Sequence, residues 1–438
     1  MDILGLKGYR VENVQQTRAD YTITAATTVE SDECPFCGDP EHLVKFGTKV
    51  QTILDAPMRG KNVVLKVARQ RYRCRKCGRT HSAPLSHIDE KRNMTDRLVA
   101  YIREKALKQT FVQVAASVGV HEKTIRNIFG DWVAKLEEKR ELVTPEWLGI
   151  DELHLVNGMR CVIADVKERR LVELLPKRDM RTVVPFLRSL PDRNRVQIVT
   201  MDMWRPYRDA AIAIFPAARV VVDKFHIVKM ANYCLDLVRK QARGGLKPGQ
   251  RRRIMRKRYI LFKRNRDLRP DEALELDMWG CHLPLLRDAY TAKEAFYDIW
   301  DQAGDADTAS SLYDFWEAGL SETVRPHFKV VTTAVKNWRT EIFAYFDSQA
   351  TNAYTECLNG IIKVANRAGR GYSFDAIRAK VLYAGQRGDD WEPVPDLSDA
   401  DQFAINQVLQ RSRSKAASTW RTLRRDYELI DESTRDSE

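Results

Sequence analysis

Residues 98–129 repeat apolar positions at the spacing of two short amphipathic helices. The apolar face of the first helix contains Phe111, Val114, Ala115 and Val118. Gly119 then allows a tight turn before the second helix. The outward polar residues of the second helix include His121, Lys123, Thr124 and Arg126. This pattern predicts a helix-turn-helix whose second helix contacts DNA, although a plain helical hairpin has the same spacing.

From Trp147 onward the pattern changes to strands. Three apolar stretches follow one another, WLGIDELHLV, MRCVIADV and RLVELL, and a helix over 181–190 precedes a fourth, VQIVTMD. The run ARVVVD, which ends at Asp223, is typical of a fifth strand. Strands interrupted by helices indicate a mixed α/β sheet. The mostly helical stretch between the fifth strand and Glu356 is too long for a simple connection, so it predicts an inserted subdomain.

Two of these strands contain an aspartate where burial is expected. Asp151 shares a strand face with Gly149 and Leu153, and Asp202 closes the fourth strand. An unpaired carboxylate is costly to bury, so Asp202 must be solvated, salt-bridged or placed beside a metal ion. If the first and fourth strands are neighbours, as in the ribonuclease H arrangement, the two aspartates meet, and a divalent cation would offset their repulsion.

A third acid lies in the segment TNAYTECLNGIIKV at 351–364, which predicts an amphipathic helix. Its polar stripe contains Asn352, Glu356, Asn359 and Lys363, and its apolar side contains Leu358, Ile361, Ile362 and Ala365. A glutamate on such a helix is usually only solvated. The aligned amides and lysine, however, suit a phosphate-bearing substrate. Three carboxylates would suit two Mg²⁺ or Mn²⁺ ions in phosphoryl transfer.

Four of the eight cysteines form two CxxCG pairs, Cys34 with Cys37 and Cys74 with Cys77. Each pair puts two thiolates on one tight turn, and four thiolates would close a structural Zn²⁺ site; unrelated surface thiols are the alternative. The strand before the second pair contains arginine at every second position, Arg69, Arg71, Arg73 and Arg75. On a strand these share a face, which would lie along DNA phosphates or form an ordinary solvated edge.

The chain of 438 residues has a formal net charge of +13 and a pI of about 9.3, which favours a polyanionic partner such as nucleic acid. The charge is concentrated early in the inserted region, at Arg252, Arg253, Arg256 and Lys257 among others. There we favour DNA contact over a solvated helix. The N-terminus lacks a signal-peptide pattern, and no apolar run has the length of a membrane span, so we expect no membrane association and a cytoplasmic location.

In order along the chain, to about Leu382, the sequence resembles bacterial insertion-sequence transposases of the DDE type, specifically the ISL-three (ISL3) family. The motifs that carry the resemblance are CPFCG and CRKCG, VAASVGVHEKTIRNI, GIDE with Asp151, TMDMWRPY with Asp202, DKFHIVKMAN from Asp223, RYILFKRNRDL, and TNAYTECLNGIIKVANRAGRGY around Glu356. One residue departs from the family pattern, because Cys357 follows the helix glutamate where the family usually has glycine.

The resemblance implies a DNA transposase that uses Asp151, Asp202 and Glu356 as a metal-binding catalytic triad, with Mg²⁺ or Mn²⁺ as cofactor. It implies double-stranded DNA as partner, both the terminal inverted repeats and the target, strand cleavage followed by strand transfer, and a homodimer that associates with the nucleoid when bound. The alternatives are a catalytically inactive, transposase-derived DNA-binding regulator, which would be expected to lack an acid, and a structure-specific nuclease. His226 would contact DNA or be a satisfied histidine.

The expected fold is multidomain α+β: a small zinc-binding domain, a helix-turn-helix domain, and a ribonuclease H-like α/β catalytic domain interrupted by a mostly helical insertion. The expected divisions are the zinc-binding domain at 1–88, the helix-turn-helix at 89–140, the first catalytic part at 141–232, the helical insertion at 233–340, the second catalytic part with the Glu356 helix at 341–390, and a C-terminal helix with an acidic tail at 391–438.

Overall fold

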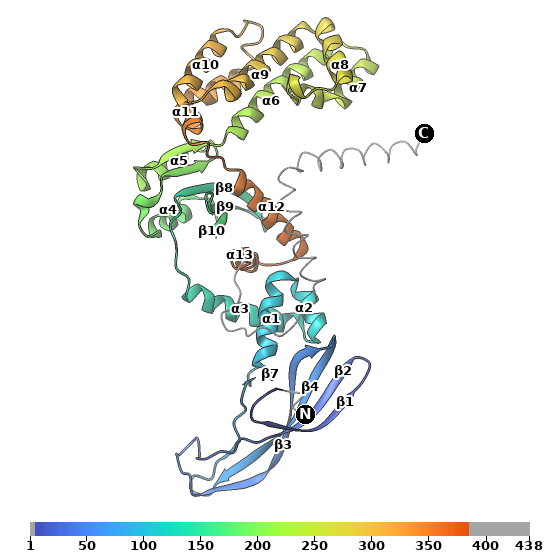
Figure 1. Cartoon of the computed structure of the whole chain (residues 1–438), viewed down its shortest axis with the longest axis vertical. Coiled ribbons are helices and arrows are strands. Elements are labelled where there is room, and N and C mark those ends of the chain that lie inside the picture. The colour runs from blue at the N-terminus through green and yellow to red at the C-terminus, as the bar shows by residue number, and fades with distance from the viewer. Residues whose placement is uncertain (1–4, 385–438) are drawn as a thin grey trace. The chain divides into compact units, whose positions relative to one another are not determined.

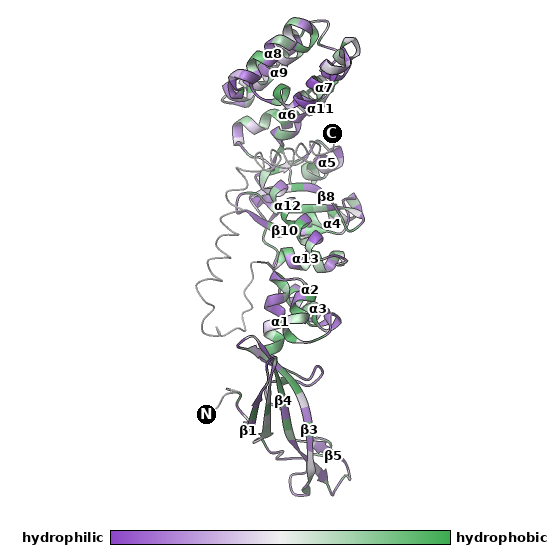
Figure 2. Cartoon of the chain, turned by 90° about the vertical axis from the view of Figure 1, so that its right-hand side faces the viewer, coloured by the Kyte–Doolittle hydropathy of each residue, from purple (hydrophilic) through white to green (hydrophobic). Residues whose placement is uncertain are grey.

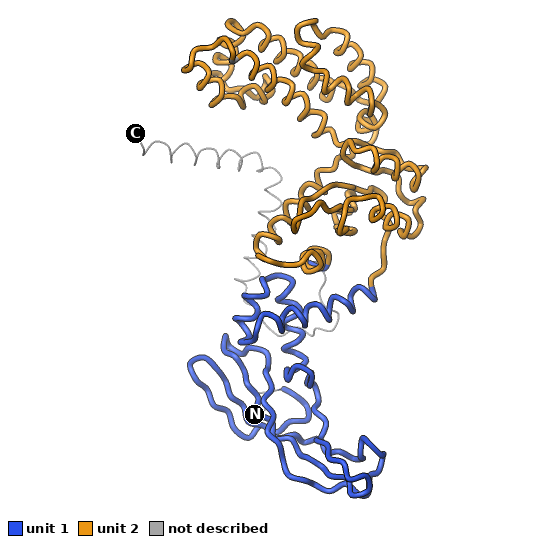
Figure 3. The backbone as a smooth tube through the Cα atoms, turned by 180° about the vertical axis from the view of Figure 1, so that it is seen from behind, with its two compact units in different colours: residues 1–139, 383–438 blue, residues 140–382 orange. Residues whose placement is uncertain are grey.

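The computed structural model describes residues 5–384 (Figure 1). These residues fall into two compact units (Figure 3). The first contains the described residues up to Lys139 together with Tyr383 and Ala384, and the second contains Arg140–Leu382. The C-terminal helix and acidic tail predicted over 391–438 lie outside the described residues. Each unit has its own sheet and its own set of helices.

The first unit begins with a sheet built around two long strands. β3 (Leu43–Met58) and β4 (Lys61–Cys74) pair antiparallel, and β2 (Asp20–Thr27) lies parallel to β4. The shorter strands are β1 (Tyr9–Gln16), β5 (Thr80–Ser82), β6 (Ile88–Asp89) and β7 (Met94–Thr95). The order is β1-β2-β4-β3-β7-β6, with β5 beside β4. Because side chains alternate along a strand, one face buries a small core of Tyr21, Ile23, Ala25, Ile53, Val63, Leu65 and Val67.

Three helices complete the described part of the first unit, α1 (Asp96–Lys108), α2 (Phe111–Val118) and α3 (Glu122–Glu138). The Thr110 hydroxyl and the Gln113 side chain form a capping box at the start of α2. Gly119 ends α2 at φ +70°, which a side chain would disfavour. Phe111 packs on Phe129, with ring centroids 5.2 Å apart. The predicted pair of helices and the glycine turn between them are therefore present.

The second unit is organised on a five-stranded sheet of order β10-β9-β8-β11-β12. Its strands are β8 (Trp147–Leu155), β9 (Gly158–Asp165), β10 (Arg170–Leu175), β11 (Ile198–Met201) and β12 (Arg219–Val222). The first three strands are antiparallel, whereas β8, β11 and β12 run parallel. This is the ribonuclease H-like arrangement expected from the sequence, with the first and fourth strands adjacent.

Strand register brings the two aspartates together. Ile150 pairs with Met201 across β8 and β11, so Asp151 and Asp202 are the next residues on neighbouring parallel strands. Met201 also pairs with Val222 of β12, so Asp223 occupies the same level one strand further along. β11 and β12 end at this level, whereas β8 continues to Leu155 beside β9. Three aspartates from distant parts of the sequence therefore lie side by side where the parallel part of the sheet ends.

Several helices cover this sheet, among them α5 (Arg205–Ile214), α11 (Lys329–Ser348), α12 (Ala353–Ala368) and α13 (Phe374–Leu382). α5 packs on β11 and β12, α11 on β12, α12 on β8 and β9, and α13 on β10, while α4 (Met180–Ser189) packs on α5. The buried carboxylate of Glu173 on β10 accepts hydrogen bonds from Arg140 at 2.6 Å and from Arg378 of α13 at 2.7 Å. This network fastens α13 to the edge of the sheet.

One expectation about α12 was wrong in detail. Leu358 and Ile362 are buried as predicted, but Ile361 is 50% exposed. Ile361 lies one position from Ile362, and a helix turns about 100° per residue, so the apolar stripe that faces the sheet is too narrow to include both. The exposed surface of α12 is therefore less polar than the sequence pattern indicated.

The region between β12 and α12 is helical. Its helices are α6 (Lys224–Ala242), α7 (Pro248–Arg256), α8 (Pro270–His282), α9 (Pro284–Gln302), α10 (Ala306–Ala318) and α11 (Lys329–Ser348). α6 packs on α9 and α11, and α9 packs on α8 and α10. Trp300 stacks on Phe346 with ring centroids 4.9 Å apart, and Trp279 and Trp316 are buried. Figure 2 shows that α7 is largely hydrophilic. α6 starts at Lys224, directly after the strand that ends beside Asp223.

Gly149 allows α12 to approach β8 closely. A Cβ at this position would lie 2.4 Å from Thr355 Oγ1 and 2.8 Å from Val166 Cγ2. Both distances are shorter than van der Waals contact, so the helix that carries Glu356 can reach the strand that carries Asp151 only because residue 149 has no side chain.

We expect Gly149→Ala to lower the free energy of unfolding by about 1–3 kcal/mol, because the added methyl overpacks the contact between β8 and α12. Urea unfolding measures this. Gly360→Ala is the control: no atom lies within 4 Å of a Cβ built there, and alanine in place of a helical glycine should stabilise by about 0.5–1 kcal/mol. Equal effects of the two substitutions would contradict the packing argument.

Candidate active site and metal centres

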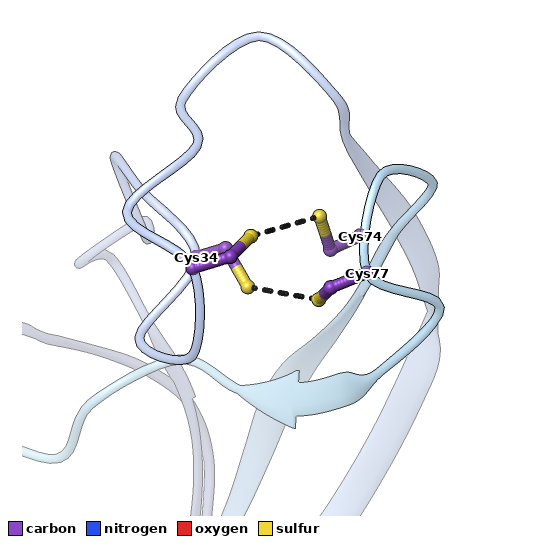
Figure 4. A group of neighbouring side chains, drawn as sticks. Cys34, Cys74 and Cys77 are labelled. Atoms are coloured by element: carbon purple, nitrogen blue, oxygen red, sulfur yellow. Dashed lines mark hydrogen bonds between the residues drawn. The ribbon is translucent and has the colours of Figure 1, made fainter.

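The two cysteine pairs form one cluster in the first unit. Cys34 Sγ lies 3.6 Å from Cys77 Sγ, and Cys37 Sγ lies 3.7 Å from Cys74 Sγ (Figure 4). Four sulfurs around a tetrahedral Zn²⁺ with bonds of about 2.3 Å are separated by roughly 3.8 Å. The four predicted ligands therefore have the spacing of a structural zinc site.

The backbone forms the same turn at both cysteine pairs. Gly38 and Gly78 have φ of +66° and +73°, and their N–H groups donate to the carbonyls of Cys34 and Cys74 at 2.8 and 2.9 Å. Burial opposes ionisation of Cys34, but the backbone N–H groups at positions 36 and 37 and the neighbouring thiols outweigh it and lower its pKa to about 7. The Asp39 N–H lowers the pKa of Cys37, but burial and the neighbouring sulfurs raise it overall. Four thiolates this close together therefore need a cation to be ionised at once.

The first acid of the predicted triad is held firmly in the second unit. Asp151 is buried, its Oδ2 accepts a hydrogen bond from Asn359 Nδ2 of α12 at 2.7 Å, and its Oδ1 accepts one from the Glu152 N–H at 2.7 Å. The Glu152 side chain instead pairs with Arg178. The alternation of the strand thus delivers one carboxylate to the site and the other to an ion pair, as predicted.

Asp202 follows β11 and lies beside His226, the third residue of α6. Asp202 Oδ1 lies 3.2 Å from His226 Nδ1, but the two atoms lack hydrogen-bond geometry, and each is buried with no hydrogen-bond partner among the described residues. Burial, followed by the negative charges of Asp223 and Glu356, raises the pKa of Asp202 from 3.8 to about 6. Burial and the charge of Asp202 likewise raise the pKa of Asp151 to about 6.

A second group of possible metal ligands lies where β12, α6 and α12 meet. Asp223, His226 and Glu356 each present one ligand atom within 4.8 Å of the others. Asp223 is 2% exposed, whereas Glu356 is exposed and lies in the first turn of α12. Burial raises the pKa of both carboxyls, and each charge adds to the effect on its neighbours. Asp151 and Asp202 are not members of this closest group, although their charges act on it.

The site contains more buried acceptors than donors. Within residues 5–384 the partnerless buried atoms include Asp202 Oδ1, Asp223 Oδ2, Asn359 Oδ1, Thr355 Oγ1 and His226 Nδ1. Such atoms are rare in folded proteins and call for an explanation. Several carboxylates with raised pKa values surround them, so a cation fits this chemistry better than a further hydrogen-bond donor. Oxygen ligands from Asp and Glu suit Mg²⁺ or Mn²⁺.

The predicted DNA-binding arginines of the first sheet have different surroundings. Arg69 is largely buried, pairs with Glu90 at 3.0 Å and donates to the Ala83 carbonyl. Arg71 and Arg73 lie over the Phe46 ring at 5.6 and 5.8 Å. Arg73 is exposed and Arg71 is half-buried. The arginines that alternation predicts on one face therefore do not share one environment. Arg69 has a structural partner, whereas Arg73 is open to solvent.

The polar residues predicted on the outer face of α3 also differ in their contacts. His121 caps the helix, because its Nδ1 accepts from the Lys123 N–H at 3.1 Å. Arg126 pairs with Glu122 and lies over Phe111. Lys123 is exposed and Thr124 is half-buried near the N-terminus of the helix. These two positions leave polar atoms toward solvent on the recognition helix of a helix-turn-helix.

In the helical region many basic side chains pair with acids of the same region. Arg253 and Lys257 both contact the buried Glu275, and Arg264 contacts Glu294, Asp298 and Asp301. Arg252 and Arg256 of α7 are exposed, as is Lys363 of α12. The basic stretch therefore contributes less unneutralised charge than the sequence indicated.

The comparisons with known families agree with this arrangement. A model of the ISL3 transposase DDE domain, described as "Transposase", matches residues 148–381, which is more than half of the chain. The chain belongs to the ISL3 family of transposases. It is therefore an enzyme of DNA transposition. Two further models match this transposase: the zinc-finger of transposase IS204/IS1001/IS1096/IS1165 at residues 30–77, and the helix-turn-helix domain of transposase family ISL3 at residues 83–133. The protein thus binds DNA and has a structural zinc ribbon.

Curated relatives carry corresponding names. The transposase for insertion sequence element IS1001 of Bordetella parapertussis is 27% identical over 387 residues, which covers 84% of this chain and 93% of that protein. The transposase for insertion sequence element IS1557 of Mycobacterium tuberculosis is 26% identical over 252 residues, which covers 51% of this chain and 56% of that protein. None of the helices within residues 5–384 is long and apolar enough to cross a membrane.

Sequence reasoning missed Asp223 as a candidate site residue of this ISL3 transposase. The signal was present, because ARVVVD is a buried strand that ends on an aspartate, as VQIVTMD does at Asp202. His226 was noticed, but as a DNA contact or a satisfied histidine, and its Nδ1 is not satisfied. The positions of Asn352 and Thr355 against β8 also depend on packing that periodicity alone does not give.

Loss of one zinc ligand should remove the metal from this transposase. We expect Cys37→Ser to reduce zinc content from about one ion per chain to near zero and to unfold the ribbon, because structural zinc contributes much of the folding free energy of such small modules. Mass spectrometric metal analysis and limited proteolysis measure this. Cys281→Ser, an exposed cysteine outside the cluster, is the control; zinc retained by Cys37→Ser would contradict the assignment.

The raised pKa of Asp202 gives a pH-dependent stability. A group whose pKa is raised on folding stabilises the fold below its unfolded pKa of 3.8, and this contribution is lost as the pH rises through about 6. Without divalent cations and with zinc bound, Asp202→Asn should therefore stabilise the second unit by about 1–3 kcal/mol at pH 7.5 and by about half as much at pH 5. Thermal unfolding at both pH values measures this, with the exposed Asp209→Asn as control. If the stability difference between Asp202→Asn and the wild type did not change with pH, the raised pKa of Asp202 could not be its cause.

Proposed function

We propose that this transposase cleaves DNA at the terminal inverted repeats of its insertion sequence and transfers the ends to target DNA, with Asp151, Asp202 and Glu356 holding two divalent cations, Mg²⁺ or Mn²⁺. The observation that carries the proposal is the row of aspartates on neighbouring strands next to α12. Asp202 Oδ1 and Asp223 Oδ2, at the ends of β11 and β12, are buried without hydrogen-bond partners in the described part of the chain, and Asp151 of β8 lies beside Asp202. When bound, such cations activate a nucleophilic oxygen and stabilise the leaving oxygen in phosphoryl transfer.

The chain's own residues hold this site in place. The Asn359 amide and the Glu152 N–H fix both oxygens of Asp151, so this carboxylate does not need to reorganise when substrate arrives. Asn352 donates to the Ile150 carbonyl at 3.4 Å and accepts from Thr200 Oγ1 at 3.2 Å, which anchors the start of α12 to β8 and β11. The exposed Lys363, two turns along α12 from Glu356, is placed to contact a DNA phosphate.

Recognition of the repeats is assigned to the first unit. The start of α3 and the arginine-bearing end of β4 would contact the duplex. The exposed Lys123 and Arg73 are the clearest candidates, with the half-buried Thr124 and Arg71 beside them. Arg252 and Arg256 of α7 would add phosphate contacts. We further propose the division into zinc-binding, helix-turn-helix, catalytic and inserted helical parts, a homodimer that pairs two element ends, and association with the nucleoid on DNA binding.

The experiment is Mg²⁺-dependent nicking of a duplex that carries the inverted repeats flanking this gene. Asp202→Asn and Glu356→Gln should each lower nicking at the repeat end by roughly a hundredfold or more, with DNA binding retained. The exposed Asp209→Asn should nick like the wild type. Binding without cleavage by any of these proteins would instead support a catalytically inactive DNA-binding regulator, and cleavage that ignores the repeat sequence would support a structure-specific nuclease.

A further inference from the structure

We propose that Asp223 and His226 are additional ligands of a divalent cation, which they bind together with Glu356, and that the imidazole makes this position prefer Mn²⁺ to Mg²⁺. The inference deepens the proposed function, on which it rests for the presence of a cation at the sheet edge. It adds two residues that sequence reasoning did not assign to the metal site.

The two oxygens of the Asp223 carboxylate have different surroundings. Asp223 Oδ1 accepts a hydrogen bond from the Phe225 N–H at 3.1 Å, which caps the start of α6. Its Oδ2 is buried and makes no hydrogen bond of normal geometry within residues 5–384, although the Asn352 N–H is near enough to lower the pKa of this carboxyl. A side chain that is 2% exposed and keeps one oxygen unpaired would destabilise the fold unless something else satisfies it. Capping therefore explains only one of the two oxygens.

His226 lies one helical turn beyond Asp223, so both side chains face the same direction from the start of α6. Its Nδ1 is buried without a hydrogen-bond partner, 3.2 Å from the equally partnerless Asp202 Oδ1. A simple ion pair would align the ring N–H with the carboxylate. Two ligands on adjacent corners of an octahedron with bonds of about 2.1 Å are separated by roughly 3 Å without such alignment. The contact with Asp202 is therefore compatible with a metal ion nearby, and it leaves the Nδ1 atom of His226 available as a ligand.

Glu356 completes the group from the other side. Its carboxylate lies within 4.8 Å of the ligand atoms of Asp223 and His226, a limit slightly above the roughly 4.2 Å that separates opposite corners of the same octahedron. Asp223 and His226 lie where the chain enters the helical region, and Glu356 lies on the helix where it returns to the sheet. A cation bound here would join the two ends of that region directly.

The ligand chemistry sets the metal preference. Carboxylate oxygens alone suit Mg²⁺, whereas imidazole nitrogen is a better ligand for transition metals than for Mg²⁺. Mn²⁺ accepts both types of ligand at octahedral geometry. A site of two carboxylates and one imidazole should thus discriminate between the two ions more strongly than a site made of carboxylates only.

The test uses the full-length, zinc-loaded protein without DNA, titrated with MnCl₂ and with MgCl₂ by calorimetry, and examined with Mn²⁺ bound by pulsed electron paramagnetic resonance. We expect tighter binding of Mn²⁺ than of Mg²⁺, and nitrogen modulation in the spectrum from a coordinated imidazole. His226→Gln should abolish this modulation and weaken Mn²⁺ binding by about tenfold or more, with a smaller effect on Mg²⁺. Asp223→Asn, which keeps the capping oxygen, should weaken binding of both ions.

The control is His154→Gln, an exposed histidine on β8, which should leave the nitrogen signal and both affinities unchanged. Circular dichroism of each variant establishes that it folds. Bound Mn²⁺ with no nitrogen modulation in the wild type, or unchanged Mn²⁺ affinity in both His226→Gln and Asp223→Asn, would overturn the inference. If nicking nevertheless depends on Asp202 and Glu356, the proposed function stands and only the additional ligands fail; if nicking is also absent, both fail.

Discussion

The second unit must hold four carboxyl groups close together, those of Asp151, Asp202, Asp223 and Glu356, where the parallel part of the sheet ends. Burial raises the pKa of each of them, and the charges of neighbouring carboxylates raise it further at Asp151, Asp202 and Glu356. A fold built for stability alone would place apolar or paired residues here, because isolated buried charges are strongly unfavourable. The apolar core beneath the sheet must therefore stabilise an arrangement that becomes favourable only when positive charge is supplied. Perturbed carboxyl pKa values of this kind are typical of functional sites.

The sheet provides the precision that such a site needs. Because β8, β11 and β12 are parallel and in register at Ile150, Met201 and Val222, their next residues project from one edge without any loop to position them. The fourth carboxylate comes from α12, whose approach depends on the missing side chain at Gly149. Rigid elements thus set three of the acids, and one tight helix contact sets the fourth.

Much of this was predictable from residue patterns. Local periodicity and residue spacing predict the strands, the helix-turn-helix and the CxxCG pairs, and a few topological rules predict that the first and fourth strands are adjacent. The order of the motifs along the chain indicated the family. What failed depended on tertiary partners. Nothing local shows that Glu90 pairs with Arg69, or that Glu275 and Asp301 neutralise basic residues far from them in sequence. Ile361 differs from Ile362 only in the direction that the helix turns it. Asp223 was missed as a site residue. An aspartate before a helix is usually a cap, and one of its oxygens is indeed a cap here.

The position of the helical region has a physical consequence for assembly of the site. The two catalytic segments that meet at the cluster, one ending β12 and the other opening α12, are separated by α6 to α11. Closing so long a loop costs conformational entropy, which the region offsets through its own core, where Trp300, Phe346 and the buried Trp316 pack. The helical region must therefore be largely folded before Glu356 can lie beside Asp223. Formation of the acidic site is therefore coupled to the folding of the helical region from α6 to α11. A cation bound between Asp223 and Glu356 would favour the same approach of the two segments that the core of the helical region favours.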